Sequence, residues 1–462
     1  MDSKPSVVPL WINGRSAAAS PAVTFPISLD EQGNTASAQS ADVEAAQLAA
    51  AAAKKAFEQW RLSSPTFRRD ILLRAAGLLD SRRAELVALQ VLETNCAEAW
   101  AQFNIDNSIN NMREIAARIT SACTGSIPAI GSEKNLGLVF KEPVGPVLLI
   151  APWNASVILA SRGLSSILGA GCTVVFKTSE ICPRVHHLLV KVFIEAGVPA
   201  DAINAIQVRR EDASEVTEAL ISHSAIRKVE FIGSAAVGRI IGAMAGKHLK
   251  PVLMELGGKC ASIILDDCEL EDAAEKCLIG DQFIQLLKRG AAEWPTGKGV
   301  NREVVQKSCD KLLDADEKGA QFLTGGPSYA SELSLQPTIL METTKEMKLW
   351  DEETFGPSVS LFVVDTDCEA IELANDSSYG LNAAIHTSNM QRAIDIARKL
   401  EVAQVHVNAL TEHDDPTYPL GAVKGSGWGR NNASYGLEEF LVPKVVSLNM
   451  SRQKLAFEIG GK

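Results

Sequence analysis

The sequence lacks several features that would assign a protein to a membrane or to an acidic partner. No apolar run approaches the roughly 20 residues that a membrane-spanning helix needs. The first ten residues lack the charged-then-apolar layout of a secretory signal, and the last ones carry no peroxisomal tripeptide. Basic residues are fewer than acidic ones, so the formal net charge is −11. This negative charge disfavours nucleic acid and anionic membranes as partners. We therefore expect a cytoplasmic protein that binds neither.

Paired cysteines are absent as well. The nine cysteines are scattered and form no C-x-x-C pair, a pattern typical of reduced thiols in a reducing compartment. The seven histidines lack the spacing of metal ligands, and the adjacent pair His186 and His187 falls on an expected helix, where neighbours point apart. We therefore expect neither a disulfide framework nor a metal site.

The sequence contains enough hydrophobic residues to form more than one core. Its 462 residues are 46% hydrophobic and 22% charged, so two or three packed domains are expected. Residues 8–12 precede Asn13-Gly14, which predicts a strand entering a hairpin. Residues 125–147, punctuated by glycine and proline, predict a β-hairpin arm that reaches away from the core. Between them we expect an all-helical block, with helices at 42–60, 65–81, 82–98 and 109–119.

From residue 147 to residue 232, short β-branched runs alternate with helical stretches. This alternation predicts parallel β-α-β units that are buried on both faces, and residues 301–408 repeat it as a second α/β domain. Ligands of such sheets bind beyond the carboxyl ends of the strands, so the residues that follow each strand are the functional candidates. The expected strands are 147–150, 172–176, 205–208 and 229–232, and the expected helices are 157–168, 184–196 and 211–222.

Glu255 stands where one apolar run stops and a glycine pair begins. Residues 251–254 predict a strand, Gly257 and Gly258 a tight turn, and residues 262–265 a second strand. One acid would thus be held at a strand end. A surface turn with an exposed glutamate explains this stretch equally well when it is considered alone.

Polar residues follow the other expected strands in the same way. Asn154 follows the first strand, and an amide there can stabilise an oxyanion, although a turn-forming asparagine is the commoner explanation. Lys177 and Glu180 follow the second strand and can reach one ribose together, or form a solvated ion pair. Residues 233–238 open a helix whose free N–H groups can hold phosphate. Their spacing is not G-x-G-x-x-G, and a packing turn is the alternative.

Taken together, these stretches resemble the aldehyde dehydrogenase superfamily across essentially the whole chain. The residues that carry the resemblance are 152–154, 177–180, 231–238, 255–259 and Glu353-Thr354-Phe355-Gly356-Pro357. Residues 405–430 more particularly resemble fungal salicylaldehyde dehydrogenases. The resemblance implies NAD-dependent oxidation of an aromatic or other apolar aldehyde to the carboxylic acid.

The resemblance also implies a role for individual residues. Asn154 would be the oxyanion amide, and Glu255 the base that activates the hydrolytic water. A carboxylate at Glu180 would repel a 2′-phosphate, which favours NAD over NADP. The implied cofactor-binding residues are Trp153, Lys177, Glu180, Gly233, Ser234, Val237, Gly238, Leu256, Glu353 and Phe355.

The implied fold is α/β, with two doubly wound parallel-sheet domains and a small β oligomerisation arm. The NAD-binding domain would comprise residues 1–119 and 148–256, and the catalytic domain residues 257–430. The arm would comprise residues 120–147 and 431–462. Its last strand, at 440–449, would join a neighbouring subunit in a homodimer or homotetramer, unless it is an edge strand within its own chain.

The cysteine nucleophile of the family is missing from this sequence. In the family it follows the glutamate by about 34 residues, in a G-Q-x-C-like turn, whereas that offset falls here on Arg289 and no such turn follows. The expected helix 271–281 runs directly into residues 283–288. Roughly two dozen residues near 281–284 therefore look deleted, a loss that a packed core would not tolerate without cost.

Three other thiols are candidates to replace this nucleophile. Cys260 is expected to be buried, and Cys268 lies among acids that raise its pKa. Cys277, in the middle of an expected helix, is the least improbable substitute. Three interpretations stay open: an ordinary dehydrogenase whose sequence has lost an exon, an NAD-binding pseudoenzyme or partner subunit, and weak turnover by another thiol.

Overall fold

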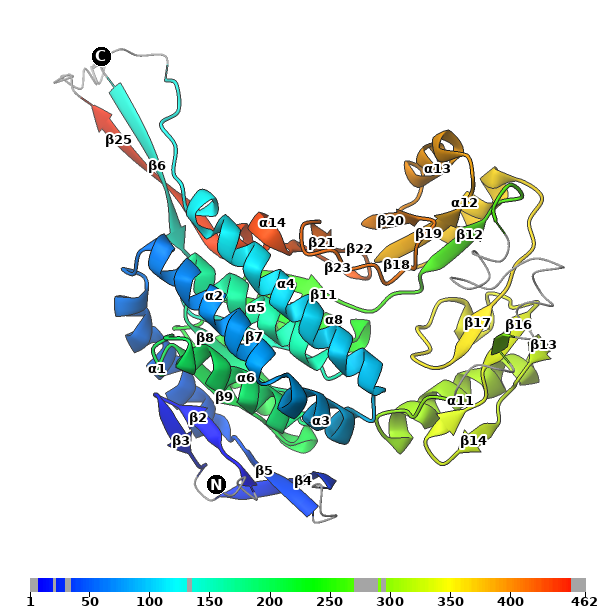
Figure 1. Cartoon of the computed structure of the whole chain (residues 1–462), viewed down its shortest axis with the longest axis horizontal. Helices are drawn as coiled ribbons and strands as arrows, with labels where there is room; N and C mark the ends of the chain where they lie inside the picture. The colour runs from blue at the N-terminus through cyan, green and yellow to red at the C-terminus, as the bar shows by residue number, and fades with distance from the viewer. Residues whose placement is uncertain are drawn as a thin grey trace, which may run out of the picture.

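An eight-stranded sheet organises the larger of two lobes (Figure 1). The larger lobe holds the elements up to β11 (Val252–Glu255), the smaller lobe begins with β12 (Ala261–Ile264), and a two-stranded arm projects from the larger lobe. None of the helices in the described ranges has the length and apolar character that crossing a membrane requires. The computed structural model describes residues 7–19, 22–29, 35–130, 135–269, 290–291 and 296–449.

Five parallel strands form the centre of this sheet. In sheet order they are β11, β10 (Lys228–Ile232), β7 (Val147–Ile150), β8 (Val174–Lys177) and β9 (Ile203–Ile206). Antiparallel strands complete its sides: β23 (Gly427–Trp428) pairs with β11, and a hairpin of β2 (Leu10–Ile12) and β3 (Arg15–Ala17) pairs with β9. The predicted strands and the N-terminal hairpin are confirmed, with shifts of a few residues.

The second strand of the alternation begins later than the sequence predicts. Helix α5 (Ser156–Ala170) ends at Gly171, whose φ of 93° is left-handed, and the Cys172 N–H still donates to the Ile167 carbonyl at 3.0 Å. Bonds of this kind close the last turn of a helix. Cys172 therefore belongs to the helix end, and the strand starts at Val174.

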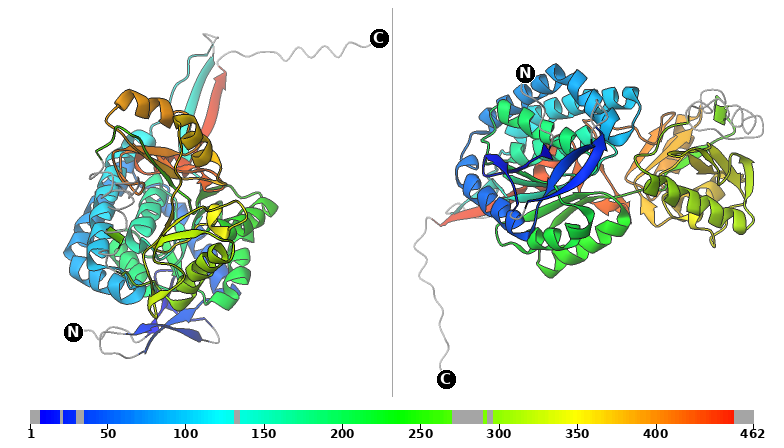
Figure 2. Two further views of the ribbon diagram at one scale, coloured as in Figure 1. Left: turned by 90° about the vertical axis from the view of Figure 1, so that its right-hand side faces the viewer. Right: turned by 90° about the horizontal axis from the view of Figure 1, so that it is seen from below.

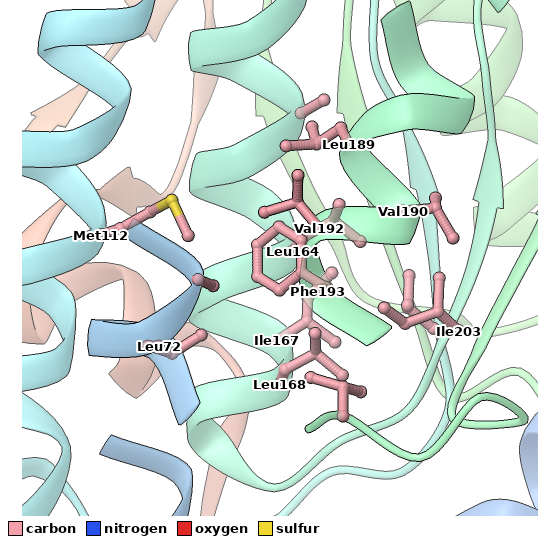
Figure 3. Packing of buried hydrophobic residues seen from close by; sticks show 14 of the residues in the cluster. Leu72, Met112, Leu164, Ile167, Leu168, Leu189, Val190, Val192, Phe193 and Ile203 are labelled. Carbon is pink, nitrogen blue, oxygen red and sulfur yellow. The ribbon is translucent and has the colours of Figure 1, made fainter. Parts of the chain in front are cut away.

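Alternating side chains of the central strands enter two different cores. Val147 and Leu149 of β7 pack with helices on one face of the sheet, whereas Leu148 and Ile150 pack on the other. This is the period of two that a strand buried on both faces requires. Figure 3 shows part of the first core, around Phe193.

Helices cover both faces of the sheet (Figure 2). One face carries α2 (Pro65–Ser81), α3 (Arg83–Thr94), α4 (Glu98–Ala122), α5 and α6 (Pro183–Glu195). The other carries α1 (Val43–Trp60), α7 (Ala213–Ser222), which follows the 3-10 helix η1 (Arg210–Asp212), and α8 (Ala235–Lys247). The four predicted helices are present, but the third ends at Thr94, the fourth already begins at Glu98, and two strands, at 23–29 and 35–40, precede α1. Side-chain caps fix the starts of α1 and α2: Asp42 accepts from the Ala45 N–H, and Ser64 from the Phe67 N–H.

The smaller lobe holds two three-stranded sheets in its described part. The parallel one contains β12, β19 (Asn382–His386) and β20 (Gln404–Val407), and it packs against α12 (Asp367–Asn375) and α13 (Met390–Ala397). The other contains β13 (Gln321–Thr324), β16 (Thr338–Met341) and β17 (Ser358–Ser360), and it packs against α11 (Arg302–Glu317). Both lobes are α/β, as the sequence predicts.

The arm pairs two segments that lie far apart in the chain. Strand β6 (Asn135–Pro143) runs antiparallel to β25 (Leu441–Asn449) along nine residue pairs. The hairpin predicted within residues 125–147 is wrong, because the partner of β6 is β25 and residues 125–130 contribute one isolated bridge, Ser126 to Val139.

Short elements complete the described chain. They are β1 (Val7–Val8), β4 (Val23–Leu29), β5 (Thr35–Ser40), β14 (Tyr329–Ser331), β15 (Ser334–Leu335), η2 (Lys348–Trp350), β18 (Tyr379–Gly380), β21 (Leu420–Gly421), β22 (Val423–Lys424), β24 (Arg430–Asn431) and α14 (Ala433–Glu439).

Candidate active site

Four neighbouring strands end along one edge of the large sheet. In the order β8, β7, β10 and β11, their carboxyl ends lead to Lys177, Asn154, Ser234 and Glu255. Parallel pairing places all four ends on the same side. The structure therefore brings these four candidate residues to one edge of the sheet, which is where ligands of open α/β sheets bind.

Glu255 is held by a buried arginine that the sequence did not reveal. Arg162, on α5, has a fully buried side chain, and its Nη2 lies 2.5 Å from Glu255 Oε2. The same oxygen accepts a hydrogen bond from Asn431 Nδ2 at 3.2 Å. The Glu255 side chain is 14% exposed, so solvent can reach it although it is anchored. The structure thus excludes the freely exposed turn glutamate.

Arg162 also faces two further carboxyl groups. Its Nη1 lies 3.5 Å from Asp414 Oδ2, and it interacts electrostatically with Glu230 in the middle of β10. Glu230 is fully buried, and neither of its carboxyl oxygens has a hydrogen-bond partner among the described residues. Burial raises the pKa of Glu230 to about 8; Arg162 opposes this rise and Glu255 adds to it. At neutral pH Glu230 is therefore mostly protonated, and Arg162 forms ion pairs with the other two carboxyl groups, those of Glu255 and Asp414.

An aromatic surface adjoins Asn154. The Asn154 carbonyl accepts a hydrogen bond from Trp100 Nε1 at 3.0 Å, and Trp100 stacks on Phe103 with ring centroids 5.5 Å apart. Both rings come from α4 and stay partly exposed, at 37% and 43%. The side-chain oxygen of Asn154 is buried and has no hydrogen-bond partner in the described part of the chain.

The residues assigned to the nucleotide lie at the ends of β8 and β10. Lys177 is buried; burial lowers its pKa, and the nearby carboxylate of Glu180 opposes that shift. Ser234 is the N-cap of α8 and accepts from the Val237 N–H at 3.4 Å. Val237 is 45% exposed on the first turn of that helix.

Two glycines shape the start of α8. A Cβ on Gly238 would overlap the side chain of Leu256, and a Cβ on Gly233 would overlap the ring of Phe231. The turn after β10 and the first turn of α8 can therefore lie close to Phe231 and Leu256 only without side chains at these positions. Leu256, which follows Glu255, is thus packed directly on α8.

Glu353 and Phe355 reach the same region from the smaller lobe. The ring of Phe355 meets Trp153 edge-to-face, with centroids 5.6 Å apart. The Glu353 carboxylate lies against Gly257, where a Cβ would overlap it, and accepts from the Gly258 N–H at 3.5 Å. The two lobes therefore meet at the glycine pair that follows Glu255.

These groups fit a dinucleotide. The N-terminus of α8 offers backbone N–H groups to phosphate, and the lysine and glutamate after β8 offer a cation and an acceptor to ribose hydroxyls. The ring of Phe355 is 51% exposed and its φ is 53°, so a left-handed backbone turns an apolar ring toward solvent.

The described thiols include one correction to the sequence prediction. Cys260 is exposed at the start of β12 rather than buried, although protein around its sulfur raises its pKa, and Glu412 and Glu353 add to the rise. Burial also raises the pKa of Cys268, and Asp267 contributes as expected. Cys277, Arg289 and the expected helices 271–281 and 283–288 lie outside the described residues.

Two of the residues that the sequence analysis missed carry a recognisable signal. Arg162 is the sole charged residue between positions 157 and 168, and Glu230 interrupts the apolar run 229–232. A charge in an element expected to be buried on both faces needs a partner. Asn431 and Trp100 give no such signal, because polar and aromatic residues are common at the positions they occupy.

Comparison with known proteins identifies the family. The sequence model described as "Aldehyde dehydrogenase family" matches residues 11–285 and 279–446. The chain belongs to the aldehyde dehydrogenase family. It is therefore a member of a family of oxidoreductases that oxidise aldehydes with NAD(P).

Similar proteins cover nearly the whole chain. A vanillin dehydrogenase of Pseudomonas sp. strain HR199 is 36% identical over 465 residues, covering 94% of this chain and 96% of that protein. The crystal structure of a salicylaldehyde dehydrogenase from Pseudomonas putida G7, complexed with salicylaldehyde, has a TM-score of 0.93 and 30% identity, covering 98% of this chain and 100% of that one. An NAD+ complex of an aldehyde dehydrogenase from Bacillus cereus has a TM-score of 0.91 and 28% identity, covering 98% and 100%.

The family part of the resemblance is thus confirmed. The salicylaldehyde dehydrogenase compared here is bacterial, so the comparison supports the type of enzyme in that expectation and not its restriction to fungi. The proteins that match well include enzymes named for aromatic aldehydes.

Proposed function

We propose that this site oxidises an aromatic aldehyde to the carboxylic acid with NAD as the hydride acceptor. The observation that carries the proposal is the anchored Glu255, which Arg162 and Asn431 hold at the sheet edge that also bears Asn154 and the start of α8. A base, an amide and a dinucleotide cradle are three of the parts that oxidation of an aldehyde to an acid needs; the fourth, a nucleophile, has no assigned residue within the described ranges.

Each residue has a role that follows from its surroundings. The Asn154 amide would donate a hydrogen bond to the aldehyde oxygen as that oxygen gains negative charge. Arg162 and Asn431 both engage Glu255 Oε2, which leaves Oε1 to accept a proton from the water that supplies the second oxygen of the acid. Bound NAD would take up the hydride that the aldehyde carbon loses. Lys177 and Glu180 would hold the adenosine ribose, and Ser234 with the α8 N-terminus the pyrophosphate.

Two features support the choice of cofactor and substrate. Glu180 lies close enough to Lys177 to interact with it, and a carboxylate that faces the ribose 2′-oxygen would repel a 2′-phosphate, which favours NAD over NADP. The stacked rings of Trp100 and Phe103 adjoin the Asn154 loop and offer a flat apolar surface to an aromatic aldehyde. The relatives named for vanillin and salicylaldehyde agree with such a substrate.

A direct assay tests this function. The purified chain is mixed with NAD and either vanillin or salicylaldehyde, and NADH is followed by its absorbance. We expect NADH formation, and a loss of about a hundredfold or more in rate on replacing Glu255→Gln, which keeps the shape of the side chain but removes the base. An absence of both NAD binding and NADH formation in the folded wild-type protein would contradict the proposal.

A second candidate function rests on the sequence near the position where the nucleophile is expected. We propose that a segment near residues 281–284 is missing, so that this chain binds NAD but turns aldehyde over weakly or not at all. The two stretches that match the family model meet at residues 279–285. In the comparison with the vanillin dehydrogenase, 94% of 462 residues is about 434, so about 30 of the 465 aligned positions have no residue in this chain.

Two measurements separate these candidates. The genomic DNA between the codons of Asp281 and Phe283 either contains skipped coding sequence or does not. Titration with NAD followed by aldehyde distinguishes the proteins themselves: NAD binding without NADH supports the nucleophile-free chain, and NADH supports a working thiol, for which Cys277 is our candidate. The domain boundaries, a cytoplasmic location and assembly through the β6–β25 arm remain predictions.

A further inference from the structure

One buried histidine lies between two loops of the candidate site. His186, on α6, is fully buried. Its Nδ1 accepts a hydrogen bond from the Ser179 N–H at 3.2 Å, and its Nε2 lies 3.1 Å from the Ser156 carbonyl oxygen. One imidazole ring therefore bonds to the backbone of the β8–α6 connection and to the first residue of α5, which directly follows the β7–α5 connection.

The hydrogen bonds fix the state of this ring. A backbone N–H can only donate, so Nδ1 carries no proton, and a carbonyl can only accept, so Nε2 carries one. Burial lowers the pKa of His186 to about 4, which keeps the ring neutral at physiological pH. Phe176, with its ring centroid 5.0 Å away, packs on the imidazole. The ring is thus held in one tautomer and one orientation.

The two connections carry different parts of the proposed site. Ser179 lies between Lys177 and Glu180, the residues assigned to the adenosine ribose, whereas Ser156 is the first residue of α5 and follows Asn154 by two positions. The neighbouring His187 has no part in this bridge, since its ring packs edge-on against Trp11.

We propose that His186 is a positioning residue that couples the ribose loop to the oxyanion loop, so that occupation of the nucleotide site orders Asn154. This inference rests on the proposed function, because it assumes that the first loop binds NAD and the second holds the aldehyde oxygen. His186 itself touches neither ligand; it acts through the backbone of Ser179 and Ser156. It also links Asn154 to Glu255 indirectly, because α5 carries Arg162.

Two half-replacements separate the two bonds. His186→Asn places an amide oxygen near the position of Nδ1 and keeps the bond to Ser179, but it is too short to reach Ser156. His186→Gln places an amide N–H near the position of Nε2 and keeps the bond to Ser156. The loss of one buried hydrogen bond corresponds to about a fivefold change in an equilibrium constant. We therefore expect the Kd for NAD to rise about fivefold in His186→Gln and to change less than twofold in His186→Asn.

A second measurement follows the coupling in the wild-type protein. Adenosine monophosphate carries the adenosine ribose without the nicotinamide, so it occupies the first loop alone. At saturating concentration it should slow backbone hydrogen exchange in residues 154–160 of the wild type. The slowing should vanish in His186→Leu, measured with the ligand again at saturation, and it should persist in the control His187→Gln.

The outcomes distinguish this inference from the proposed function. Equal affinities in His186→Asn and His186→Gln, or unchanged exchange at 154–160 on adding adenosine monophosphate, would overturn the coupling while NAD binding by the wild type upheld the function. A folded wild-type chain that binds neither nucleotide would overturn the proposed function, and this inference with it. The wild-type exchange measurement decides even where a variant fails to fold.

Discussion

The titration of a single residue, Glu230, makes the free energy of unfolding of this protein depend on pH. It is buried in β10 without a hydrogen-bond partner among the described residues, and its pKa is raised by burial to about 8. In the unfolded chain the same carboxyl has its ordinary pKa of 4.5. Between these two pH values the folded state holds a proton that the unfolded state has lost, so the free energy of unfolding falls as pH rises through the window.

The substitution Glu230→Gln should remove this dependence, since glutamine resembles the protonated acid. Its apparent melting temperature should be closest to that of the wild type near pH 5 and should exceed it by most near pH 8. The difference in unfolding free energy should grow by at most about 1.4 kcal/mol per pH unit. The measurement is thermal unfolding of both proteins at several pH values, with the exposed Glu218→Gln as control. A difference that stays constant from pH 5 to pH 8 would show that Glu230 is ionised in the folded protein.

The residue scale also shows what the sequence can and cannot predict about a site. Asn154, Lys177 and Glu255 were identified because each follows an apolar run that reads as a parallel strand, and such strand ends meet at one edge. Arg162 and Asn431 were not, because their contact with Glu255 depends on how α5 crosses the sheet and on a segment 176 positions away. The local pattern around Arg162 indicates a buried charge that needs a partner, but it does not indicate that the partner is Glu255.

At the scale of elements, the edge strand β23 supports the end of β11. Glu255 pairs with Gly427, whose φ is 115°, and a Cβ on Gly427 would overlap the Met254 carbonyl oxygen. The Leu256 N–H also donates to the Ser426 carbonyl at 2.8 Å. The backbone that presents Glu255 is therefore fixed by a close approach that only glycine permits.

Gly427→Ala should destabilise the protein and displace Glu255. The clash with backbone and the positive φ together should cost more than the roughly 1–2 kcal/mol of a left-handed alanine alone. Gly319→Ala is the matched control, because Gly319 has a φ of 88° and open space around its Cβ position. Thermal unfolding compares the two, and NAD titration tests whether Gly427→Ala alone weakens binding. Equal losses of stability would mean that φ strain, and not the contact with β11, determines the effect.

Elements were predicted well from their patterns and less well at their ends. The short apolar run of β7 and the alanine-rich stretch of α1 are local signals, and both elements appear as expected. Strand β8 begins at Val174 and not at the predicted residue 172, because Gly171 and Cys172 complete the preceding helix. Such capping depends on a left-handed glycine, which a hydrophobic pattern does not register.

At the scale of the whole molecule, the arm is a feature that the rest of the described chain leaves largely uncovered. It is a two-stranded sheet in which every residue of β25 after Leu441 is exposed. A sheet of two strands without a covering layer is marginally stable at best. The arm joins segments that lie far apart in the sequence, as the ion pair of Glu142 with Lys444, 302 residues away, shows. This is why the sequence suggested an arm but assigned the wrong partner to its first strand.

The exposed side chains of β25 predict that the arm binds a second copy of the chain. Val445 is 66% exposed and Leu448 is 41% exposed on this strand, and an exposed apolar edge is a template for pairing with another sheet. The molar mass in solution should therefore be a multiple of the 49.4 kDa chain, and the double substitution of Val445→Glu and Leu448→Glu should reduce it to that of one chain. Light scattering after size-exclusion chromatography measures both, and Val363→Glu, at a residue 71% exposed on the other lobe, is the control. A monomeric wild type would contradict this prediction, and an oligomer that survives the double substitution would show that the contact lies elsewhere. Because the exposed valine and leucine lose no packing in a lone chain, a monomeric variant that kept the wild-type NAD affinity would show that each cofactor site is complete within one chain.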